Sequence, residues 1–332
     1  MIDVAMIGLG AWANELAASV HNRSDSIRIR ACHSPSAASR TRFSRRFDAA
    51  AKGSLEETLA DPGIQAVVLA TPHSTHLDLI GRAVAKGKHV FCEKPLALTY
   101  RDAQTAAALC RAAGLVLAVG QNKRFSPLAG HIKSMLDRDE LGTLLHFESN
   151  FSFPGAQVFS RGGWRIAPQE NPGGGLTSCA IHVFDLAAWY FGPVRSVSAI
   201  IRRRSGASDL DDVAAILLDF DCGATGYVGC LFASAYTFFV NVYGTRGAVY
   251  SEPETNLLRL HLGPLDQLAA REVTVDTVDT LKLELEAFAE SCASGEPYPI
   301  APAEAAHAVA IMEAAVLSGR DNGRRIEVAR FA

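Results

Sequence analysis

A glycine-rich turn near the start of the chain most strongly constrains the fold. Residues 2–7 form a short apolar run, and Gly8-Leu9-Gly10-Ala11-Trp12-Ala13 follows directly, in the pattern G-x-G-x-x-A. Residues 14–21 then have the character of a helix. A strand, such a turn and a helix in this order predict a binding site for the pyrophosphate of a dinucleotide.

The small residues of the turn each have a physical role in such a site. Gly8 permits the tight turn, Gly10 lets the backbone approach a pyrophosphate, and Ala13 allows the helix to pack closely on the strand. The free backbone N–H groups at Ala11 and Trp12, together with the helix dipole, are expected to bind the anion. A glycine-rich turn alone is weak support, so the prediction depends on the elements that follow it.

Strands and helices continue to alternate up to about residue 120. The expected strands are 27–32, 64–70, 89–92 and 115–119, and the expected helices are 54–59, 77–85 and 99–113. The strands are almost continuous apolar runs, which is typical of a parallel sheet covered on both faces. The sequence therefore predicts an α/β fold with an N-terminal NAD(P)-binding Rossmann domain over residues 1–121.

The pattern changes in the second part of the chain. Residues 150–175 carry six glycines and three prolines and are expected to form a long loop. Further on, apolar residues alternate at period two over 197–201, 214–220, 225–232, 238–243 and 248–251, and helices are expected over 281–292 and 303–317. Alternation at period two predicts antiparallel strands. We therefore expect a C-terminal α+β domain with a mostly antiparallel sheet over residues 122–332, which binds the substrate.

Composition argues against several kinds of partner. The 332 residues carry a formal net charge of −3, with both signs spread along the chain, so we expect no nucleic-acid partner. No apolar run reaches the roughly 18 residues that span a bilayer, so we expect no membrane partner. The seven cysteines include no C-x-x-C pair, and the first residues do not resemble a signal peptide. These features favour a cytoplasmic protein with reduced thiols.

The segment after the second expected strand bears on the choice between NAD and NADP. NAD-binding domains usually place Asp or Glu about 20 residues after the turn, where it holds the ribose 2′-hydroxyl. This chain has His33 and Ser34 there, followed by Arg40 and Arg42. No carboxylate would repel a 2′-phosphate, and guanidinium and hydroxyl groups can bind one, which favours NADP. The alternative is that the arginines face water and NAD binds without the carboxylate.

A second motif, Cys92-Glu93-Lys94-Pro95-Leu96, ends the strand expected at 89–92. It lies at the carboxyl end of a parallel strand, where open sheets bind ligands. Lys94 can direct its ammonium toward a substrate oxygen, and Pro95 fixes the backbone as it leaves the strand. The alternative is a surface lysine in a proline turn.

Taken together, the motifs resemble those of the glucose–fructose oxidoreductase, inositol dehydrogenase and rhizopine-catabolism (Gfo/Idh/MocA) oxidoreductases. The resemblance covers essentially the whole chain. The motifs that carry it are Gly8-Leu9-Gly10, Ala70-Thr71-Pro72 with His76, Glu93-Lys94-Pro95-Leu96, Gln121-Asn122-Lys123-Arg124-Phe125, Trp164-Arg165, Gly173-Gly174-Gly175 with His182 and Asp185, Gly244-Thr245-Arg246-Gly247 and Ser318-Gly319-Arg320.

The resemblance implies NAD(P)-dependent hydride transfer at a hydroxyl carbon of a sugar, cyclitol or related ring. It also implies an open second sheet that associates subunits, and hence a homodimer or homotetramer. The implied catalytic residues are Lys94 and His182. Further implied cofactor-binding residues are Thr71, Pro72, His76, Glu93, Asn122 and again Lys94. The implied substrate-binding residues are Arg124, Trp164, Arg165, Ser178 and Asp185. No metal is expected, because the H-x-x-H pair His73 and His76 lacks an evident third ligand.

One position departs from the family pattern. Similar members carry Asp-x-x-x-His after the glycines, whereas the residue four before His182 is Ser178. A serine can donate and accept a hydrogen bond, but it holds no negative charge near the histidine. Some relatives that act on cyclic dihydrodiols of aromatic acids also lack this Asp, so such substrates remain candidates. A dehydrogenase or reductase is the leading hypothesis; a cofactor-binding sensor and a cofactor-recycling hydrolase or lyase are the alternatives.

Overall fold

A computed structural model describes residues 1–159, 163–263 and 269–330 and divides the chain into two compact units. The first unit comprises Met1–Asn122 together with Asp279–Ala306, and the second comprises Lys123–Val278 together with His307–Ala332. A single boundary near residue 121 therefore does not describe the chain, because residues 279–306 return to the first unit.

Helix α9 (Thr280–Ser294) explains this return. It packs against α1 and against strands β1, β2 and β5 of the first unit. Phe288 is fully buried, and its ring centroid lies 5.8 Å from that of Phe91 in β5. The apolar face expected on this helix thus completes the core of the N-terminal unit.

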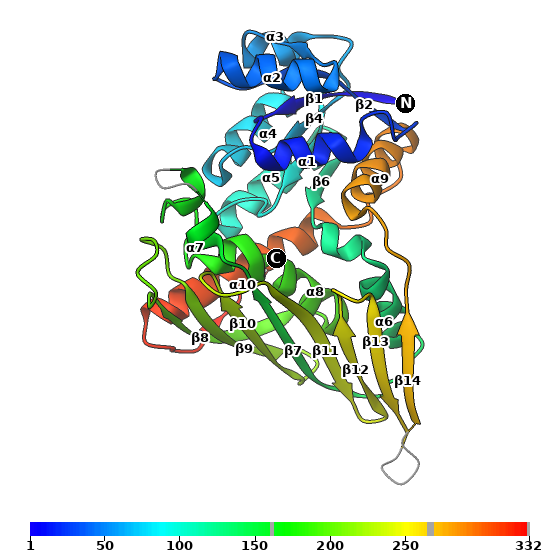
Figure 1. Ribbon diagram of the computed structural model, residues 1–332, viewed down its shortest axis with the longest axis vertical. Helices are drawn as coiled ribbons and strands as arrows, with labels where there is room; N and C mark the ends of the chain where they lie inside the picture. The colour runs from blue at the N-terminus through cyan, green and yellow to red at the C-terminus, as the bar shows by residue number, and fades with distance from the viewer. Residues whose placement is uncertain (160–162, 264–268, 331–332) are drawn as a thin grey trace. The chain divides into compact units, whose positions relative to one another are not determined.

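The first unit is built on a six-stranded parallel sheet with the order β3-β2-β1-β4-β5-β6 (Figure 1). Its strands are β1 (Ile2–Ile7), β2 (Ile27–His33), β3 (Ala50–Ala51), β4 (Ala66–Leu69), β5 (His89–Glu93) and β6 (Leu117–Gly120). Its helices besides α9 are α1 (Ala11–Val20), α2 (Ala37–Phe47), α3 (Leu55–Ala60), α4 (His76–Val84) and α5 (Tyr100–Ala112). The strand order reverses at β1 and β4, which is where open α/β sheets bind ligands. The expected fold class is confirmed.

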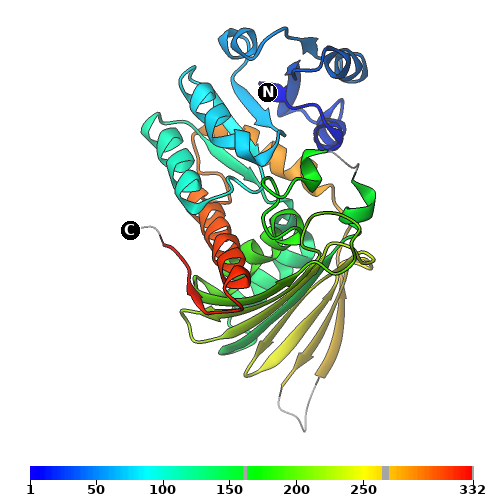
Figure 2. The same ribbon diagram turned by 90° about the vertical axis from the view of Figure 1, so that its left-hand side faces the viewer.

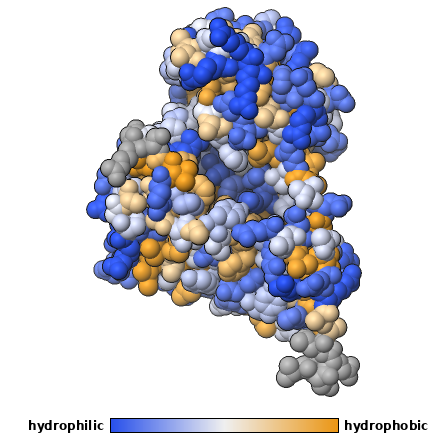
Figure 3. Space-filling view, viewed as in Figure 1, coloured by the Kyte–Doolittle hydropathy of each residue, from blue (hydrophilic) through white to orange (hydrophobic). Residues whose placement is uncertain are grey.

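The start of α3 agrees with the sequence pattern, whereas helix α2 was not expected. The Ser54 side chain accepts a hydrogen bond from the backbone of Glu57, as the pattern at the start of α3 predicts. Helix α2 was not expected, because four arginines mask its two buried anchors, Phe43 and Phe47. Hydrophilic side chains cover most of the visible surface of this part of the chain (Figure 3).

The second unit contains a nine-stranded sheet with the order β14-β13-β12-β11-β7-β10-β9-β8-β15. Every neighbouring pair is antiparallel except β7 and β10, which run parallel. The strands are β7 (Leu144–Ser152), β8 (Val194–Arg202), β9 (Val213–Phe220), β10 (Thr225–Leu231), β11 (Thr237–Gly244), β12 (Gly247–Glu252), β13 (Leu257–Leu262), β14 (Ala269–Thr274) and β15 (Ile326–Glu327). The five expected strands correspond to β8–β12.

Helices lie on one face of this sheet, and within the described ranges no helix covers the other face (Figure 2). They are α6 (Pro127–Asp137), α8 (Ile181–Phe191) and α10 (Pro302–Arg320), of which the part from His307 onward belongs to this unit. The loop expected over 150–175 is shorter, because β7 extends to Ser152 and is followed by the short helix α7 (Gly155–Val158). Residues 160–162 of that segment lie outside the described residues.

Two general features of the chain complete the description. Across the described residues, no helix is both long and apolar enough to cross a membrane. Over the same ranges, no group of three or more His, Cys, Asp or Glu side chains is placed to hold a metal ion.

Candidate active site

The glycine-rich turn after β1 has the geometry of a phosphate-binding turn. Gly8 has a φ of +85°, and a Cβ there would lie 2.5 Å from the carbonyl oxygen of Ala70, so only glycine is accommodated. At Gly10, in contrast, a Cβ would meet no atom of the protein within 4 Å. Ala13 is fully buried where α1 packs on the sheet. The turn therefore leaves open space in front of the first turn of α1.

The start of α1 presents hydrogen-bond donors to this space. Gly10 is the N-cap residue, no side chain caps the helix, and its first turn has no acidic residue. The buried indole Nε1 of Trp12 has no hydrogen-bond partner among the described residues. Free N–H groups and the positive end of the helix dipole bind anions. These features fit the pyrophosphate of a dinucleotide, held by the backbone at Gly10, Ala11 and Trp12.

The turn after β2 carries the residues expected near the ribose. The Arg40 guanidinium donates to the carbonyl oxygens of Ser34 (2.6 Å) and Pro35 (3.1 Å). The His33 ring nitrogen Nδ1 lies 3.2 Å from the Lys52 carbonyl oxygen, and Arg42 donates to the Ser39 hydroxyl. The turn thus holds one guanidinium against its backbone and has no carboxylate at residues 33–36.

His76 connects the loops that follow β4 and β5. The side chain is fully buried, and its ring nitrogens lie 3.0 Å from the Pro95 carbonyl oxygen and 3.3 Å from that of Thr71. The Thr71 hydroxyl accepts a further hydrogen bond from Thr75. His76 therefore fixes the Thr71-Pro72 turn relative to the Glu93-Lys94-Pro95 segment, and this places both loops at the carboxyl edge of the sheet.

Glu93 and Lys94 end strand β5 at the same edge. Glu93 is buried, and its Oε2 accepts a hydrogen bond from the Lys94 backbone at 3.2 Å. A Cβ on Gly120, at the end of β6, would lie 2.9 Å from Glu93 Oε1, so the glycine makes room for the carboxylate. Nearby in the chain, the Asn122 side chain donates to Thr280 at the start of α9.

In the second unit, His182 lies at the beginning of α8, directly after a π-helical segment (Leu176–Ala180). Such segments occur frequently at functional sites. Gly174 has a φ of +56°, and a Cβ there would lie 1.9 Å from the Asp211 carbonyl oxygen. The glycine run is therefore needed for the close approach of the backbone that leads into the His182 helix, and His182 itself is 6% exposed.

Ser178 belongs to a hydrogen-bond network that includes other expected substrate residues. Its hydroxyl donates to Asn171 Oδ1 at 3.1 Å, and Asn171 Nδ2 donates to the carbonyl oxygens of Trp164 (3.3 Å) and Arg165 (3.0 Å). Asn171 was not among the residues expected at the site, although an Asn-Pro pair before three glycines is a turn signal. The Arg165 guanidinium lies 4.2 Å from the Trp164 ring centroid.

Arg124 and Asp185, both expected to bind substrate, form a buried bidentate ion pair. The guanidinium donates to the two carboxylate oxygens at 2.7 and 2.9 Å, and the side chains are 5% and 1% exposed. Arg124 also lies over the Trp189 ring, at 4.9 Å from its centroid. In the structure each charge is balanced by the other, and the pair connects the segment before α6 to α8.

The ring next to His182 belongs to a cluster of aromatic side chains on the sheet. The Phe151 ring lies 6.1 Å from the His182 ring, 4.9 Å from Phe238 and 6.0 Å from Tyr236. Lys123 Nζ lies over Phe151 and Phe238, at 5.5 and 4.7 Å. The pairing of β7 with β11 brings the two phenylalanines opposite each other. Because β7 was not expected, no sequence signal could place this aromatic wall beside His182.

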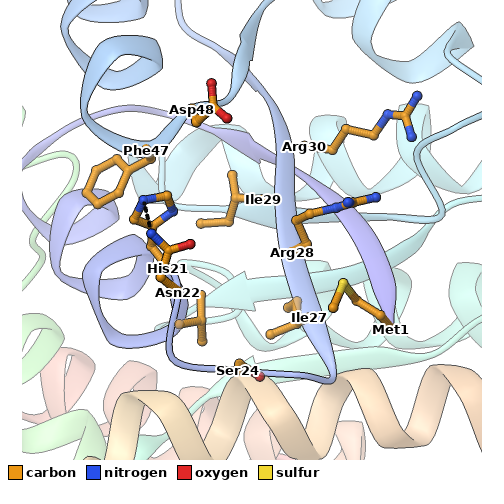
Figure 4. A pocket seen from close by; sticks show the side chains of 11 residues that line it. Met1, His21, Asn22, Ser24, Ile27, Arg28, Ile29, Arg30, Phe47 and Asp48 are labelled. Atoms are coloured by element: carbon orange, nitrogen blue, oxygen red, sulfur yellow. Dashed lines mark hydrogen bonds between the residues drawn. The ribbon is translucent and has the colours of Figure 1, made fainter.

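A separate hollow of about 380 Å³ lies near the amino ends of β1 and β2, as Figure 4 shows. Its two arginines, Arg28 and Arg30, form ion pairs with Asp3, and Asn22 is hydrogen-bonded to the His21 ring. Ligands of open parallel sheets bind at the carboxyl ends of the strands. This hollow lies at the other end, so it is not part of the candidate active site.

A Rossmann unit with an anion-binding turn, joined to an open-sheet unit that carries a buried histidine, defines the class of two-unit dinucleotide-dependent oxidoreductases. Comparison with family models agrees with this class. Residues 2–121 match the oxidoreductase family with an NAD-binding Rossmann fold, and residues 130–250 match the GFO/IDH/MocA C-terminal domain. The chain belongs to the Gfo/Idh/MocA oxidoreductase family.

Several curated relatives are similar over part of their length. The scyllo-inositol 2-dehydrogenase (NAD(+)) of Bacillus subtilis is 32% identical over 58% of this chain and 57% of its own. The D-xylose 1-dehydrogenase (NADP(+)) 2 of Haloferax volcanii is 29% identical over 74% and 75%. The trans-1,2-dihydrobenzene-1,2-diol dehydrogenase of Sus scrofa is 30% identical over 62% and 60%. The chain thus spans little more than half the length of the first of these relatives.

Among solved structures, levoglucosan dehydrogenase in complex with NADH and levoglucosan superposes with a TM-score of 0.90. The match covers 99% of this chain and 100% of that one, at 22% identity. At this level of identity the likeness supports the fold alone.

Proposed function

We propose that the protein is an NAD(P)-dependent dehydrogenase or reductase that transfers hydride at a hydroxyl-bearing carbon of a sugar, cyclitol or cyclic diol. The observation that carries the proposal is the buried His182 at the start of α8, in a chain whose other unit presents an open anion site at Gly10. The regulatory alternative receives no support from the relatives, which are named as dehydrogenases.

The residues have distinct roles in this proposal. The nicotinamide, when bound, accepts or supplies the hydride. His182 exchanges the hydroxyl proton of the substrate as a general acid–base group. The Lys94 ammonium holds the substrate oxygen and stabilises negative charge that develops there. Ser178 takes the position of the family Asp, and its bond to Asn171 keeps the Trp164-Arg165 segment in place.

The surroundings of His182 support a ring-shaped substrate. Phe151, Phe238 and Tyr236 form an apolar surface, whereas Lys123 and His182 provide polar groups beside it. Ligand pockets usually combine apolar walls with a few polar groups that fix orientation. A sugar, cyclitol or cyclic diol can place its C–H face against the rings and its hydroxyls toward the polar groups. We include Arg165 and the Arg124–Asp185 pair in the framework of this substrate site.

A direct test follows reduction of the cofactor by absorbance at 340 nm with a panel of polyols, sugars and cyclic diols. We expect turnover with at least one ring substrate, and loss of that turnover when the substrate hydroxyl is removed. If no member of the panel, and no corresponding ketone in the reverse direction, changes the cofactor signal, the dehydrogenase proposal is wrong.

The charge of the ribose-binding turn leads to a cofactor prediction. We expect NADP to bind more tightly than NAD, because residues 33–36 carry no carboxylate and Arg40 and Arg42 lie close behind. The double change Arg40→Ala and Arg42→Ala should weaken NADP binding by roughly tenfold or more, about 1.4 kcal/mol, and leave NAD binding unchanged. Fluorescence titration with both cofactors measures this. A tenfold preference of the wild-type protein for NAD would contradict the prediction.

We further propose that the uncovered face of the second sheet joins subunits into a homodimer or homotetramer. Ile200, Leu217 and Tyr227 on adjacent strands are 57%, 59% and 37% exposed, and Tyr227 is opposite Leu217 in the register. Sedimentation should show an oligomer that Leu217→Glu dissociates, because a charge buried in an interface core is costly. Leu109→Glu, at an exposed leucine of α5, should leave the oligomer intact. A monomeric wild-type protein would refute the proposal.

The proposal also includes a cytoplasmic location. All seven cysteines are free thiols in the structure, and five of them are buried. Proteins of reducing compartments generally lack disulfides.

A further inference from the structure

A buried carboxyl group in the first unit has no role in the mechanism described so far. Glu284 projects from α9 and is completely buried. Neither of its carboxylate oxygens has a hydrogen-bond partner among the described residues. An ionised carboxylate in such a position would lose several kcal/mol of hydration without compensation. The side chain therefore requires either a proton or a nearby positive charge.

Helix α9 packs on β5, and Phe288, one helical turn after Glu284, has its ring 5.8 Å from that of Phe91. The charged groups that act on Glu284 are Glu93 and Lys94, which follow Phe91 at the carboxyl end of β5. Burial raises the pKa of Glu284 well above its usual value, the negative charge of Glu93 raises it further, and the positive charge of Lys94 opposes both effects. The other titratable groups on α9 and on the elements that pack against it are ion-paired, hydrogen-bonded or exposed, apart from the half-buried thiol of Cys292. They are Asp3, Glu15, His21, Arg28, Arg30, Cys32, His33, His89, Cys92, Lys282, Glu286, Glu290 and Cys292.

The balance of charge among Glu284, Glu93 and Lys94 decides which carboxyl group is protonated. Two ionised carboxylates beside one ammonium would leave a net negative charge inside the unit. When two carboxyl groups share a buried site, one of them retains its proton. Glu93 accepts a hydrogen bond from the Lys94 backbone, and such a bond favours the ionised form. Glu284 has no donor of this kind among the described residues, so the proton resides on Glu284.

We propose that Glu284 is a positioning residue for Lys94: it remains a neutral carboxylic acid beside Glu93, so that a single carboxylate charge faces the Lys94 ammonium. The inference rests on the proposed role of Lys94 in catalysis. It adds that a pair of carboxyl groups, one from β5 and one from α9, controls the charge state of Lys94.

The two carboxyl groups, of Glu93 and Glu284, affect the protonation of Lys94 at alkaline pH. As the pH rises, Glu284 releases its proton, and the second negative charge strengthens the hold of Lys94 on its own proton. Lys94 therefore remains an ammonium to a higher pH than it would beside Glu93 alone. Glu284→Gln keeps the shape of the neutral acid but removes this second charge. The alkaline limb of kcat/KM should then move to lower pH by about one unit, with little change in kcat at neutral pH.

A measurement independent of activity detects the proton itself. Infrared spectra of the protein without cofactor or substrate should show the C=O stretch of a protonated carboxyl at neutral pH. That band should be absent in Glu284→Gln and present in Glu290→Gln, a matched change of an exposed glutamate on the same helix. In addition, the thermal midpoint of the wild type should fall relative to that of Glu284→Gln as the pH rises above about 5, because the unfolded chain has then released this proton while the folded wild type still holds it.

The outcomes separate this inference from the proposed function. Loss of the band together with an alkaline shift supports the inference. An unchanged band in Glu284→Gln overturns it, whatever the activity. Loss of the band without a shift of the kcat/KM profile shows a structural acid that does not act on Lys94, and this also overturns it. If the band behaves as expected and no substrate reduces the cofactor, the dehydrogenase proposal fails while the protonation of Glu284 stands.

Discussion

Gly10→Val should abolish dinucleotide binding while the protein remains folded. A Cβ at Gly10 meets no protein atom within 4 Å, so the larger side chain causes no clash within the chain. It would instead occupy the space in front of the free N–H groups of α1, where the pyrophosphate is expected. We expect the affinity for NAD and NADP to fall at least 100-fold, about 2.7 kcal/mol, as measured by fluorescence titration.

Gly130→Val provides the matched control for this prediction. Gly130 lies in α6 of the second unit, and a Cβ there also meets no atom within 4 Å. The control should leave cofactor affinity unchanged and should not weaken the helix, because valine has a higher helix propensity than glycine. Gly8 would be a poor control, because its positive φ and the nearby Ala70 carbonyl oxygen make any side chain disruptive. Unchanged affinity in Gly10→Val would show that the phosphates bind elsewhere.

Much of the first unit was predictable because its signals are local. Parallel strands buried on both faces appear as short apolar runs, and the turn between β1 and α1 requires particular small residues. Helix α2 was not predicted, because its only buried residues are Phe43 and Phe47, which lie among four arginines. The placement of α9 in the first unit could not be read from periodicity, since an amphipathic helix does not specify the surface that it covers.

The candidate site was predictable where motifs carry it and unpredictable where distant elements meet. Lys94 and His182 follow from motifs, whereas Phe151 and Phe238 become neighbours only through the pairing of β7 with β11. Glu284 is an intermediate case. It lies within one helical turn of Leu281 and Phe288, on the apolar face expected for this helix, so a buried carboxyl group was foreseeable from spacing alone. That Glu93 would be its neighbour was not foreseeable, because this depends on the packing of α9 on β5.

Removal of either proposed catalytic side chain, Lys94 or His182, should strongly reduce turnover. Lys94→Ala and His182→Ala should each lower turnover by about 10²- to 10⁴-fold, the usual contribution of a general acid–base or charge-stabilising group. Cofactor affinity should change little, because neither side chain belongs to the turn that holds the pyrophosphate. Steady-state kinetics with the substrate found in the panel, and titration of the cofactor, measure the two quantities separately. Lys133→Ala and His131→Ala, on α6, should leave turnover unchanged.

The double variant tests whether the two residues act on the same substrate oxygen. Residues that act as a unit are strongly non-additive, so Lys94→Ala with His182→Ala should lose less than the product of the two single losses. Ser178→Ala should cost roughly tenfold or less, because one neutral hydrogen bond contributes about 0.5–1.5 kcal/mol. Fully multiplicative losses would indicate that Lys94 and His182 act independently. Full turnover in His182→Ala would show that another group transfers the proton, and Tyr243 or Lys94 itself would then be the next candidate, although Tyr243 donates its hydroxyl to Glu148 in the structure.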